Sequence, residues 1–426
     1  MVGVLTVSFI VLLILTVPIG FAMGLSSIIA LIFQDKIPLI VVVQRIFTGM
    51  DSFPFLAIPL FVIAGALMDT GGIAIRLVNL AKALVGFIRG GLGMSVVVGE
   101  ILFSGISGST TADVSAISSL LIPAMKKAGY SIPNSVSIVS AASAMGILVP
   151  PCINMVILGA MTDQSIGALF MAGFIPAFVM AAVIMVLIYY QAVREGLPAD
   201  GRPSLKTLGR TLKDGLIPML FPIIIFGGIL GGIFTVTEAA AVAVIYALFV
   251  GVFVYREITM QKLINILAEA AITTALVVFL IGTASIFSWL LTSQMVPQKL
   301  GAFIHTFTSS KIIFLLLSNL VFIIMGGILE GAPALIIFIP IMMPIAQAFG
   351  VDPLHYSILA IACVGIGLFL PPIGVGILVA CRIAGITVNK VFKAMLPYIV
   401  VLLIGLLIIT FVPWFSLVLP KIFSLV

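Results

Sequence analysis

Charged side chains are scarce in this chain of 426 residues. Asp, Glu, Lys and Arg together make up 8% of it, against about 25% in soluble globular domains. The longest polar stretch runs only from Arg194 to Asp214, so the chain has no room for a water-soluble domain. Neither a GxxxxGK[ST] pattern nor a Gly-Lys dipeptide occurs, which excludes the phosphate-binding loop of an ATPase. The energy for any pumping must therefore come from an ion gradient or from a partner.

Cysteine is also rare. The three cysteines, Cys152, Cys363 and Cys381, lie in apolar surroundings and form no CxxC pair. We interpret them as core residues, not as disulfide partners or metal ligands. The net charge of +6 is scattered over helix ends and forms no basic patch. We therefore expect no nucleic-acid partner and attribute these charges to membrane orientation.

Long apolar runs fill the chain instead. Hydrophobic residues make up 62% of the sequence, and many runs exceed the roughly 20 residues that cross a bilayer. The first is too long to be a cleaved signal peptide. We predict an all-α polytopic membrane protein embedded in a lipid bilayer. Its clearest apolar runs are Val4–Phe33, Ile166–Val193, Leu216–Val254 and Met395–Leu419.

The chain contains an internal repeat. A shift of 221 residues lays prolines and glycines of the first half onto those of the second, although proline is only 23 of 426 residues. Such duplication is typical of secondary transporters. We predict a first repeat at 1–193, a basic linker at 194–214 and a second repeat at 215–426. The matched residues are Pro123, Gly129, Gly146, Pro150, Pro151 and Pro176, which recur as Pro344, Gly350, Gly367, Pro371, Pro372 and Pro397.

Helix-breaking residues lie inside an apolar segment of each repeat. In the first, residues 104–116 hold six serines or threonines, two glycines and Asp113. In the second, residues 326–333 hold three glycines, Glu330 and Pro333. A polar turn at membrane depth is tolerated only inside protein or beside a water-filled cavity. We therefore predict re-entrant helical hairpins at about 94–125 and 313–346.

A Pro-Pro pair follows each hairpin, at 150–151 and 371–372. Proline removes a backbone donor and bars the preceding residue from helical geometry. The sequence thus predicts broken transmembrane helices at about 135–160 and 355–381. We expect the carbonyls ahead of each pair to lose their helical partners and to remain free for a desolvated Na⁺.

The linker is the most positive part of the chain and is expected on the cytoplasmic side. The first dozen residues carry no charged side chain, and Lys421 is the only positive residue after Lys393. Both termini are therefore expected on the periplasmic side. A cytoplasmic middle with both ends outside requires an odd number of crossings in each half, which would make the repeats inverted.

The breaks supply oxygen atoms, the ligands that hard cations prefer. We predict two or more Na⁺ sites, one at each hairpin with its Pro-Pro break. The first site would use hydroxyls and carbonyls, and the second would rely more on backbone. The expected ligands are Ser104, Ser107, Gly146, Val149 and Pro150 in the first site, and Gly326, Gly327, Gly331, Gly367, Leu370 and Pro371 in the second.

An anionic substrate would lie between the hairpin tips. There it would face the partial positive charge of broken-helix ends and the donors of nearby side chains. The predicted substrate-binding residues are Ser109, Thr110, Thr111, Asp113, Asn154, Glu330, Gly331 and Ala332.

Acidic residues inside apolar segments are costly and often functional. Asp113 and Glu330 lie at the hairpin tips, which favours a role at the site. Glu238 follows Thr235 near an expected helix start, so helix capping is its alternative role. Glu100 and Glu269 are the other two acidic residues in or beside apolar segments.

Other interpretations of the same residues remain. Serines and glycines also let transmembrane helices pack closely. The GxSG pattern at 105–108 occurs in intramembrane serine proteases, but a nucleophilic serine needs a base, and only His305 and His355 are available. A passive channel would not account for paired breaks.

At these residues the chain resembles the large membrane subunit of tripartite ATP-independent periplasmic (TRAP) transporters, in the ion-transporter superfamily. The resemblance covers essentially the whole chain. It implies two inverted repeats, a scaffold and an elevator-type transport domain that carries the hairpins and broken helices, all driven by Na⁺. Its most specific parts are SGISGSTTADVSAISSLLIPAM, GILVPPCINMVILG and GLFLPPIGVGI.

The resemblance also implies partners and a location. Members of this family work with a small four-helix membrane subunit and with a periplasmic solute-binding protein that hands over an organic acid. No extra helices precede Val4, so the small subunit is expected as a separate chain. The implied function is Na⁺-driven uptake, across the bacterial inner membrane, of sialic acid or another sugar acid, or of a C4-dicarboxylate.

The alternative transporter is a stand-alone Na⁺/dicarboxylate or citrate symporter of the same superfamily. Such symporters resemble this chain in their hairpins but carry Ser-Asn-Thr at the tips. Here the tips read Ser-Gly-Ser-Thr-Thr and Glu-Gly-Ala-Pro, which argues against that branch.

Overall fold

A computed structural model describes residues 1–34, 37–197, 199 and 205–425, with only the backbone described for residues 106, 107 and 205–207. Over these ranges the chain is helical and forms no β-strand beyond an isolated bridge between Arg89 and Ala199. Eight helices in the described ranges are long and apolar enough to cross a membrane. The predicted all-α class is confirmed, and these helices agree with a polytopic membrane protein.

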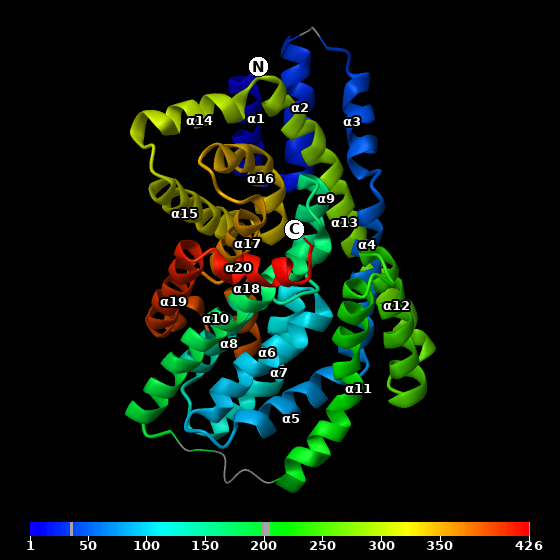
Figure 1. Ribbon diagram of the computed structural model, residues 1–426, viewed down its shortest axis with the longest axis vertical. Coiled ribbons are helices and arrows are strands. Elements are labelled where there is room, and N and C mark those ends of the chain that lie inside the picture. The colour runs from blue at the N-terminus through cyan, green and yellow to red at the C-terminus, as the bar shows by residue number, and fades with distance from the viewer. Residues whose placement is uncertain (35–36, 198, 200–204, 426) are drawn as a thin grey trace.

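The first half begins with a bundle and continues with a helical hairpin, a broken helix and a long helix (Figure 1). The bundle comprises α1 (Val2–Ile14), α2 (Ile19–Gln34), α3 (Ile40–Met50), η1 (Phe53–Leu56), α4 (Ala57–Thr70) and α5 (Ile73–Val85). The rest comprises α6 (Gly91–Ser107) and α7 (Thr110–Lys127), α8 (Ile132–Gly146) and α9 (Ile153–Thr162), and α10 (Ile166–Arg194).

The second half repeats this order of elements. It opens with α11 (Leu205–Leu230), α12 (Val236–Phe249), the π-helical turn η2 (Val250–Val254), α13 (Met260–Ser293) and α14 (Val296–Phe307). The hairpin is α15 (Lys311–Leu329) and α16 (Gly331–Ala348), and the broken helix is α17 (Pro353–Leu368) and α18 (Val375–Ala384). The long helix α19 (Val388–Phe411) and the short α20 (Trp414–Ile422) complete the chain.

The helix bounds follow the shift of 221 residues. The shift moves the bounds of α7 onto those of α16, and those of α9 onto those of α18 within one residue. The hairpins turn over fewer residues than the polar composition predicted: only Gly108 and Ser109 separate α6 from α7, and only Glu330 separates α15 from α16. A left-handed Gly108 (φ +64°) accommodates the first turn.

Both broken helices begin at strong N-terminal signals. The Ser131 side chain accepts a hydrogen bond from the Asn134 amide, and the Asp352 carboxylate accepts two from Leu354 and His355. A proline lies in the first turn of each helix, where no intrahelical donor is needed. Each helix then ends ahead of a Pro-Pro pair, and both Pro-Pro peptide bonds are cis.

The elements form two groups. Helix α13 packs on α2, α3 and α4, while α12 packs on α4. The hairpins pack on the broken helices, α6 on α8 and α15 on α17, and the two halves meet where α8 contacts α17 and α9 contacts α16. In Figure 1, α3, α4, α11 and α12 lie along one side of the molecule, beside the hairpins and broken helices.

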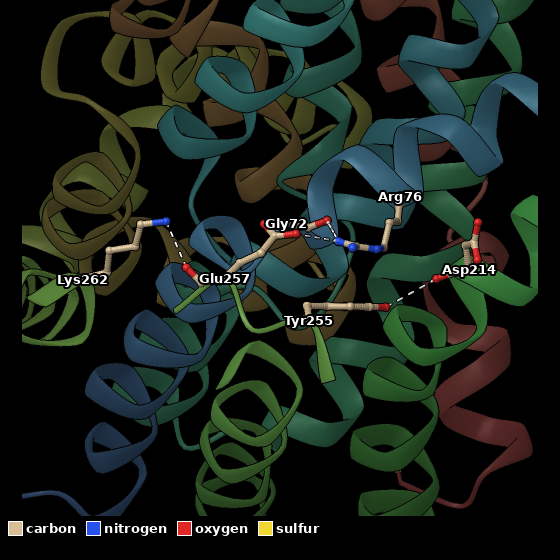
Figure 2. A network of polar contacts seen from close by, with 6 residues as sticks. All are labelled: Gly72, Arg76, Asp214, Tyr255, Glu257 and Lys262. Carbon is tan, nitrogen blue, oxygen red and sulfur yellow. Dashed lines mark hydrogen bonds and ion pairs between the residues drawn. The ribbon is translucent and has the colours of Figure 1, made fainter. Parts of the chain in front are cut away.

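A polar network ties the α4–α5 turn to the segment between η2 and α13 (Figure 2). The Arg76 guanidinium donates to the Gly72 carbonyl at 2.5 Å and pairs with Glu257 at 3.3 Å. It also lies over the Tyr255 ring, 3.7 Å from the centroid. The Tyr255 hydroxyl in turn donates to the Asp214 carbonyl at 3.4 Å. The network therefore holds the start of α5, the helix that leads into the first hairpin.

We predict that Arg76→Ala lowers the stability of the purified protein by about 1 kcal/mol, because it removes a cation–π contact and a partly exposed ion pair. The apparent melting temperature in detergent measures the effect. Lys82→Ala, which removes a positive charge from the other end of α5, is the control and should cost less. Equal melting temperatures for the two variants would contradict the role of the network.

The second hairpin makes a close backbone approach that can be tested separately. A Cβ on Gly326 would lie 2.7 Å from the Val364 Cα and 2.8 Å from its carbonyl oxygen. Gly326→Ala must therefore push α15 away from α17, and overpacking of this kind costs about 1–3 kcal/mol. Gly227→Ala on α11 is the matched control, since its Cβ would meet nothing within 4 Å. We expect a lower melting temperature only for Gly326→Ala, and equal values would disprove the close approach.

Candidate functional site

A cavity of about 550 Å³ lies between the hairpin tips and the bundle. Seven of the eight predicted substrate-binding residues line it, and Asp113 does not. Its volume is within the range of small-molecule sites. The seven residues are Ser109, Thr110, Thr111, Asn154, Glu330, Gly331 and Ala332.

Four helices begin at this cavity. The first residues of α7, α9 and α16 line it, and so does the start of α2, at residues 18–21. The residues that precede α7, α9 and α16 make no side-chain capping hydrogen bond within the described chain. By contrast, α8, α10 and α17 are capped by Ser131, Ser165 and Asp352. Amide donors and positive dipole ends are thus directed at one space, as an anion site requires.

Side chains add neutral donors and acceptors. The Ser109 and Thr111 hydroxyls lie 3.3 Å apart, and the Asn154 side chain lies beside the backbone of Gly331. Residues of the first hairpin, the first broken helix and the second hairpin therefore come together at the cavity. Such a surface can bind both a carboxylate and hydroxyl groups.

The cavity also carries negative charge. Asp69 from α4, Glu269 from α13 and Glu330 line it, and no lysine or arginine occurs among the described lining residues. All three acidic residues are exposed to the cavity or to its opening. The cavity therefore combines the positive ends of helices at the breaks with carboxylates around them.

Glu330 has an unusual backbone. Its φ of 69° and ψ of 174° lie in a region that is essentially restricted to glycine, at a cost of about 1–3 kcal/mol. A glycine would remove this strain, yet a carboxylate occupies the position. Strain of this kind concentrates at functional sites, which agrees with a role for Glu330 in the cavity.

The structure does not place Asp113 at the cavity with the other predicted substrate-binding residues. Asp113 is 2% exposed and accepts a hydrogen bond from Ser104 instead of lining the cavity. Successive residues of a helix are rotated by about 100°. Because α7 begins at Thr110, Thr110 and Thr111 face the cavity while Asp113 faces the interior.

The residues proposed for the first Na⁺ site lie close together. A Cβ on Gly146 would lie 2.5 Å from the Ser104 hydroxyl oxygen. A Cβ on the neighbouring Gly105 would lie 3.0 Å from the Pro150 carbonyl and 3.4 Å from a methyl group of Val149. The side chain of Ser107 lies outside the described residues.

The residues proposed for the second Na⁺ site form two sets. Gly327 and Gly367 are in backbone contact, and Gly326 lies against the preceding turn of α17. Leu370 and Pro371 follow in the break, whereas Gly331 lies at the cavity. The structure thus brings the glycines of hairpin and broken helix together and places Gly331 with the substrate residues.

The prediction that the carbonyls before each Pro-Pro pair are free is wrong for three of them. The Gly146 carbonyl accepts a hydrogen bond from the Val149 amide at 2.8 Å, and the Gly367 carbonyl accepts one from Leu370 at 3.0 Å. The Leu370 carbonyl accepts one from Gly374. The chain tightens into short turns because an unpaired carbonyl is costly to bury. Each oxygen retains a second lone pair for a cation.

Three contributors to the cavity were not predicted from the sequence. The α2 start at residues 18–21 and the α13 face reach it through long-range packing, which no local pattern reveals. Asp69 had a signal, because it ends an apolar run just as Glu269 interrupts one. The two histidines lie elsewhere: His355 contacts the Ser416 hydroxyl and His305 stacks on Phe349.

Comparisons with known proteins identify the family of this chain. The family model of the tripartite ATP-independent periplasmic transporter, DctM component, matches residues 6–415. The C4-dicarboxylate TRAP transporter large permease protein DctM of Pseudomonas aeruginosa is 37% identical over 94% of this chain and 94% of its own. The sialic acid TRAP transporter large permease protein SiaM of Vibrio cholerae is 36% identical over 95% of each.

A solved structure supports the fold alone. The YdaH transporter of Alcanivorax borkumensis superimposes with a TM-score of 0.64 at 16% sequence identity, over 88% of this chain and 87% of that one. The full-length family match and the two relatives are more specific than this likeness. The chain therefore belongs to the DctM component of tripartite ATP-independent periplasmic transporters, the large permeases of a transport family and not enzymes.

Proposed function

We propose that this permease carries out Na⁺-driven uptake of an organic acid anion across the bacterial inner membrane. A periplasmic solute-binding protein would deliver the substrate, and a small four-helix subunit, as a separate chain, would complete the membrane part. Both termini would face the periplasm and the linker at 194–214 the cytoplasm. Six residues of that linker, 198 and 200–204, lie outside the described residues. Membership of a tripartite family favours this arrangement over a stand-alone symporter.

The convergence of four helix N-termini on one cavity carries the proposal. Three of these ends lack a side-chain cap within the described chain, so their amides have room for a ligand. Half-helix N-termini near mid-membrane hold the carboxylates of transported substrates in several transporter folds. A substrate carboxylate bound here would satisfy the amides without any arginine or lysine.

The carboxylates of the cavity favour a substrate with few negative charges. A second substrate carboxylate would approach Asp69, Glu269 or Glu330, and like charges repel in a low dielectric. Hydroxyl groups, in contrast, would donate to these carboxylates. We therefore favour a hydroxylated acid of the sialic or sugar-acid class over a C4-dicarboxylate, although large permeases named for both occur among the relatives.

Transport would follow an elevator mechanism. The hairpins and broken helices, α6–α9 and α15–α18, would move as the transport part against a scaffold of α1–α4 and α11–α13. The packing of α13 mainly on α2, α3 and α4, with a smaller contact to α16, supports this division. Inverted repeats would give the cavity equivalent inward-facing and outward-facing positions. Na⁺ at the two break regions would couple the movement to the ion gradient.

Reconstitution tests the proposed function. We predict that proteoliposomes take up labelled sialic acid only when this chain, the small subunit, the binding protein and an inward Na⁺ gradient are all present. Replacement of Na⁺ by choline should reduce uptake to the level of empty liposomes. Uptake by this chain alone would favour the stand-alone symporter, and uptake without Na⁺ would contradict coupling to the ion.

Glu330→Gln tests the substrate class, because it removes one negative charge and keeps the side-chain shape. We expect the ratio of C4-dicarboxylate to sugar-acid uptake to rise by on the order of tenfold, as one unit charge a few ångströms away is worth about 1 kcal/mol or more. Asp163→Asn is the control, since it removes an exposed charge at the end of α9, outside the cavity. An unchanged ratio in Glu330→Gln would refute the electrostatic selection.

A further inference from the structure

Two phenylalanine rings form part of the cavity wall on the side of the bundle. Phe21 lies in the first turn of α2 and Phe279 lies on α13, and both line the cavity. Their ring centroids are 4.8 Å apart, and the ring planes are inclined by 49°. Phe21 is 55% exposed and Phe279 is half-buried. The pair therefore presents aromatic surface to the cavity.

Glycine at position 20 lets the Phe279 ring lie close against the start of α2. A Cβ on Gly20 would lie 3.0 Å from two carbon atoms of this ring, which is closer than the usual separation of carbon atoms in contact. Helices α2 and α13 pack on each other (Figure 1). The packing of the two helices thus holds the Phe279 ring in place.

The cavity face of α13 changes in chemistry along the helix. Glu269 and Thr273 line the cavity at one end of this face, and Leu276 and Leu280 line it further along. Their spacing of three or four residues places them on one side of the helix. Phe279 lies beside the apolar part of this face. The wall is therefore polar near Glu269 and apolar near the two phenylalanines.

The aromatic pair also lies beside backbone amide donors. Phe21 belongs to the first turn of α2, whose first amides have no intrahelical acceptor. A carboxylate held by these amides would bring the atoms bonded to it close to the two rings. An extended dicarboxylate has little C–H surface to offer there, whereas a ring-shaped acid has a whole face.

We propose that Phe21 and Phe279 bind the C–H face of a cyclic sugar acid whose carboxylate lies at the start of α2. The face of an aromatic ring carries partial negative charge and attracts the weakly positive hydrogens of C–H bonds. The hydroxyl groups of the sugar extend from the ring edge, in the direction of the polar part of α13. The inference rests on the proposed function, because it specifies the shape of the substrate class favoured there.

The two phenylalanines are therefore specificity-determining residues. They select a ring over an open chain of the same charge, a distinction that the carboxylates of the cavity cannot make. A structural role alone would instead lower the affinity for both kinds of acid alike.

D-Glucuronate and D-gluconate test this selection, because they have equal numbers of carbon atoms and of carboxylates, but only glucuronate closes into a ring. We predict that the purified full chain in NaCl binds glucuronate more tightly, as measured by titration with ligand-observed NMR. Phe21→Leu and Phe279→Leu keep an apolar side chain and lose the aromatic ring. In each, the Kd for glucuronate should rise about fivefold and that for gluconate should change little.

Two further variants serve as controls. Phe279→Trp retains an aromatic face and should preserve the preference for the ring. Phe249→Leu should leave both dissociation constants unchanged, since Phe249 is 56% exposed and pairs with Phe253 outside the cavity. Saturation-transfer NMR gives a second readout: the ring C–H protons of bound glucuronate should receive the most saturation, and Phe279→Leu should remove this preference.

An unchanged ratio of the two dissociation constants in both leucine variants would overturn the proposal. A parallel loss of affinity for both acids would overturn it as well, because it indicates a structural role. Equal binding of the two acids by the unaltered chain, or binding of neither, would likewise contradict it.

The proteoliposome assay separates this inference from the proposed function. Na⁺-driven uptake of sialic acid that neither leucine variant changes would reject the role of the aromatic pair alone. Absence of uptake by the complete unaltered transporter would reject the proposed function, whatever the binding measurements show.

Discussion

The structure depends on one constraint: inside a membrane, every backbone polar group needs a partner. A helix that ends in the bilayer leaves amides at its N-terminus and carbonyls at its C-terminus without intrahelical bonds. This chain ends helices inside both halves, at Gly108, Glu330 and the two Pro-Pro pairs. Carbonyl groups near the breaks accept hydrogen bonds within short turns, as the Gly146 carbonyl does from the Val149 amide. Amides at helix N-termini are directed into a shared cavity. The backbone amides at these helix N-termini thus form a surface that can bind an anion.

The same constraint sorts the acidic residues into two classes. Glu330 is held at the cavity despite a strained backbone, where water or substrate can reach its carboxylate. Glu100 and Asp113 are sealed between α6, α7 and α8. In the proposed function, the first class restricts which substrates the cavity accepts. Thr111 and Asp113 lie in the same first turn of α7, so that one turn carries a cavity residue and a buried carboxylate.

Much of the architecture could be predicted from local composition. Breaks at residues 104–116 and at the Pro-Pro pairs were visible because Gly, Ser and Pro are conspicuous in apolar runs. The capping role considered for Glu238 is confirmed by its paired hydrogen bonds with Thr235. The direction in which Asp113 points was not predictable, since it depends on the residue at which α7 begins. The contribution of α2 to the cavity arises from packing between distant segments, and no sequence pattern carries that information.

We propose that broken-helix N-termini, and not basic side chains, hold the substrate. A density map of the complete transporter with bound sugar acid in NaCl tests this most directly. We expect a substrate carboxylate within hydrogen-bonding distance of the first amides of α7, α9 or α16, with the substrate hydroxyl groups toward Glu330 or Glu269. A substrate carboxylate paired with an arginine or lysine, with these amides facing water, would contradict it.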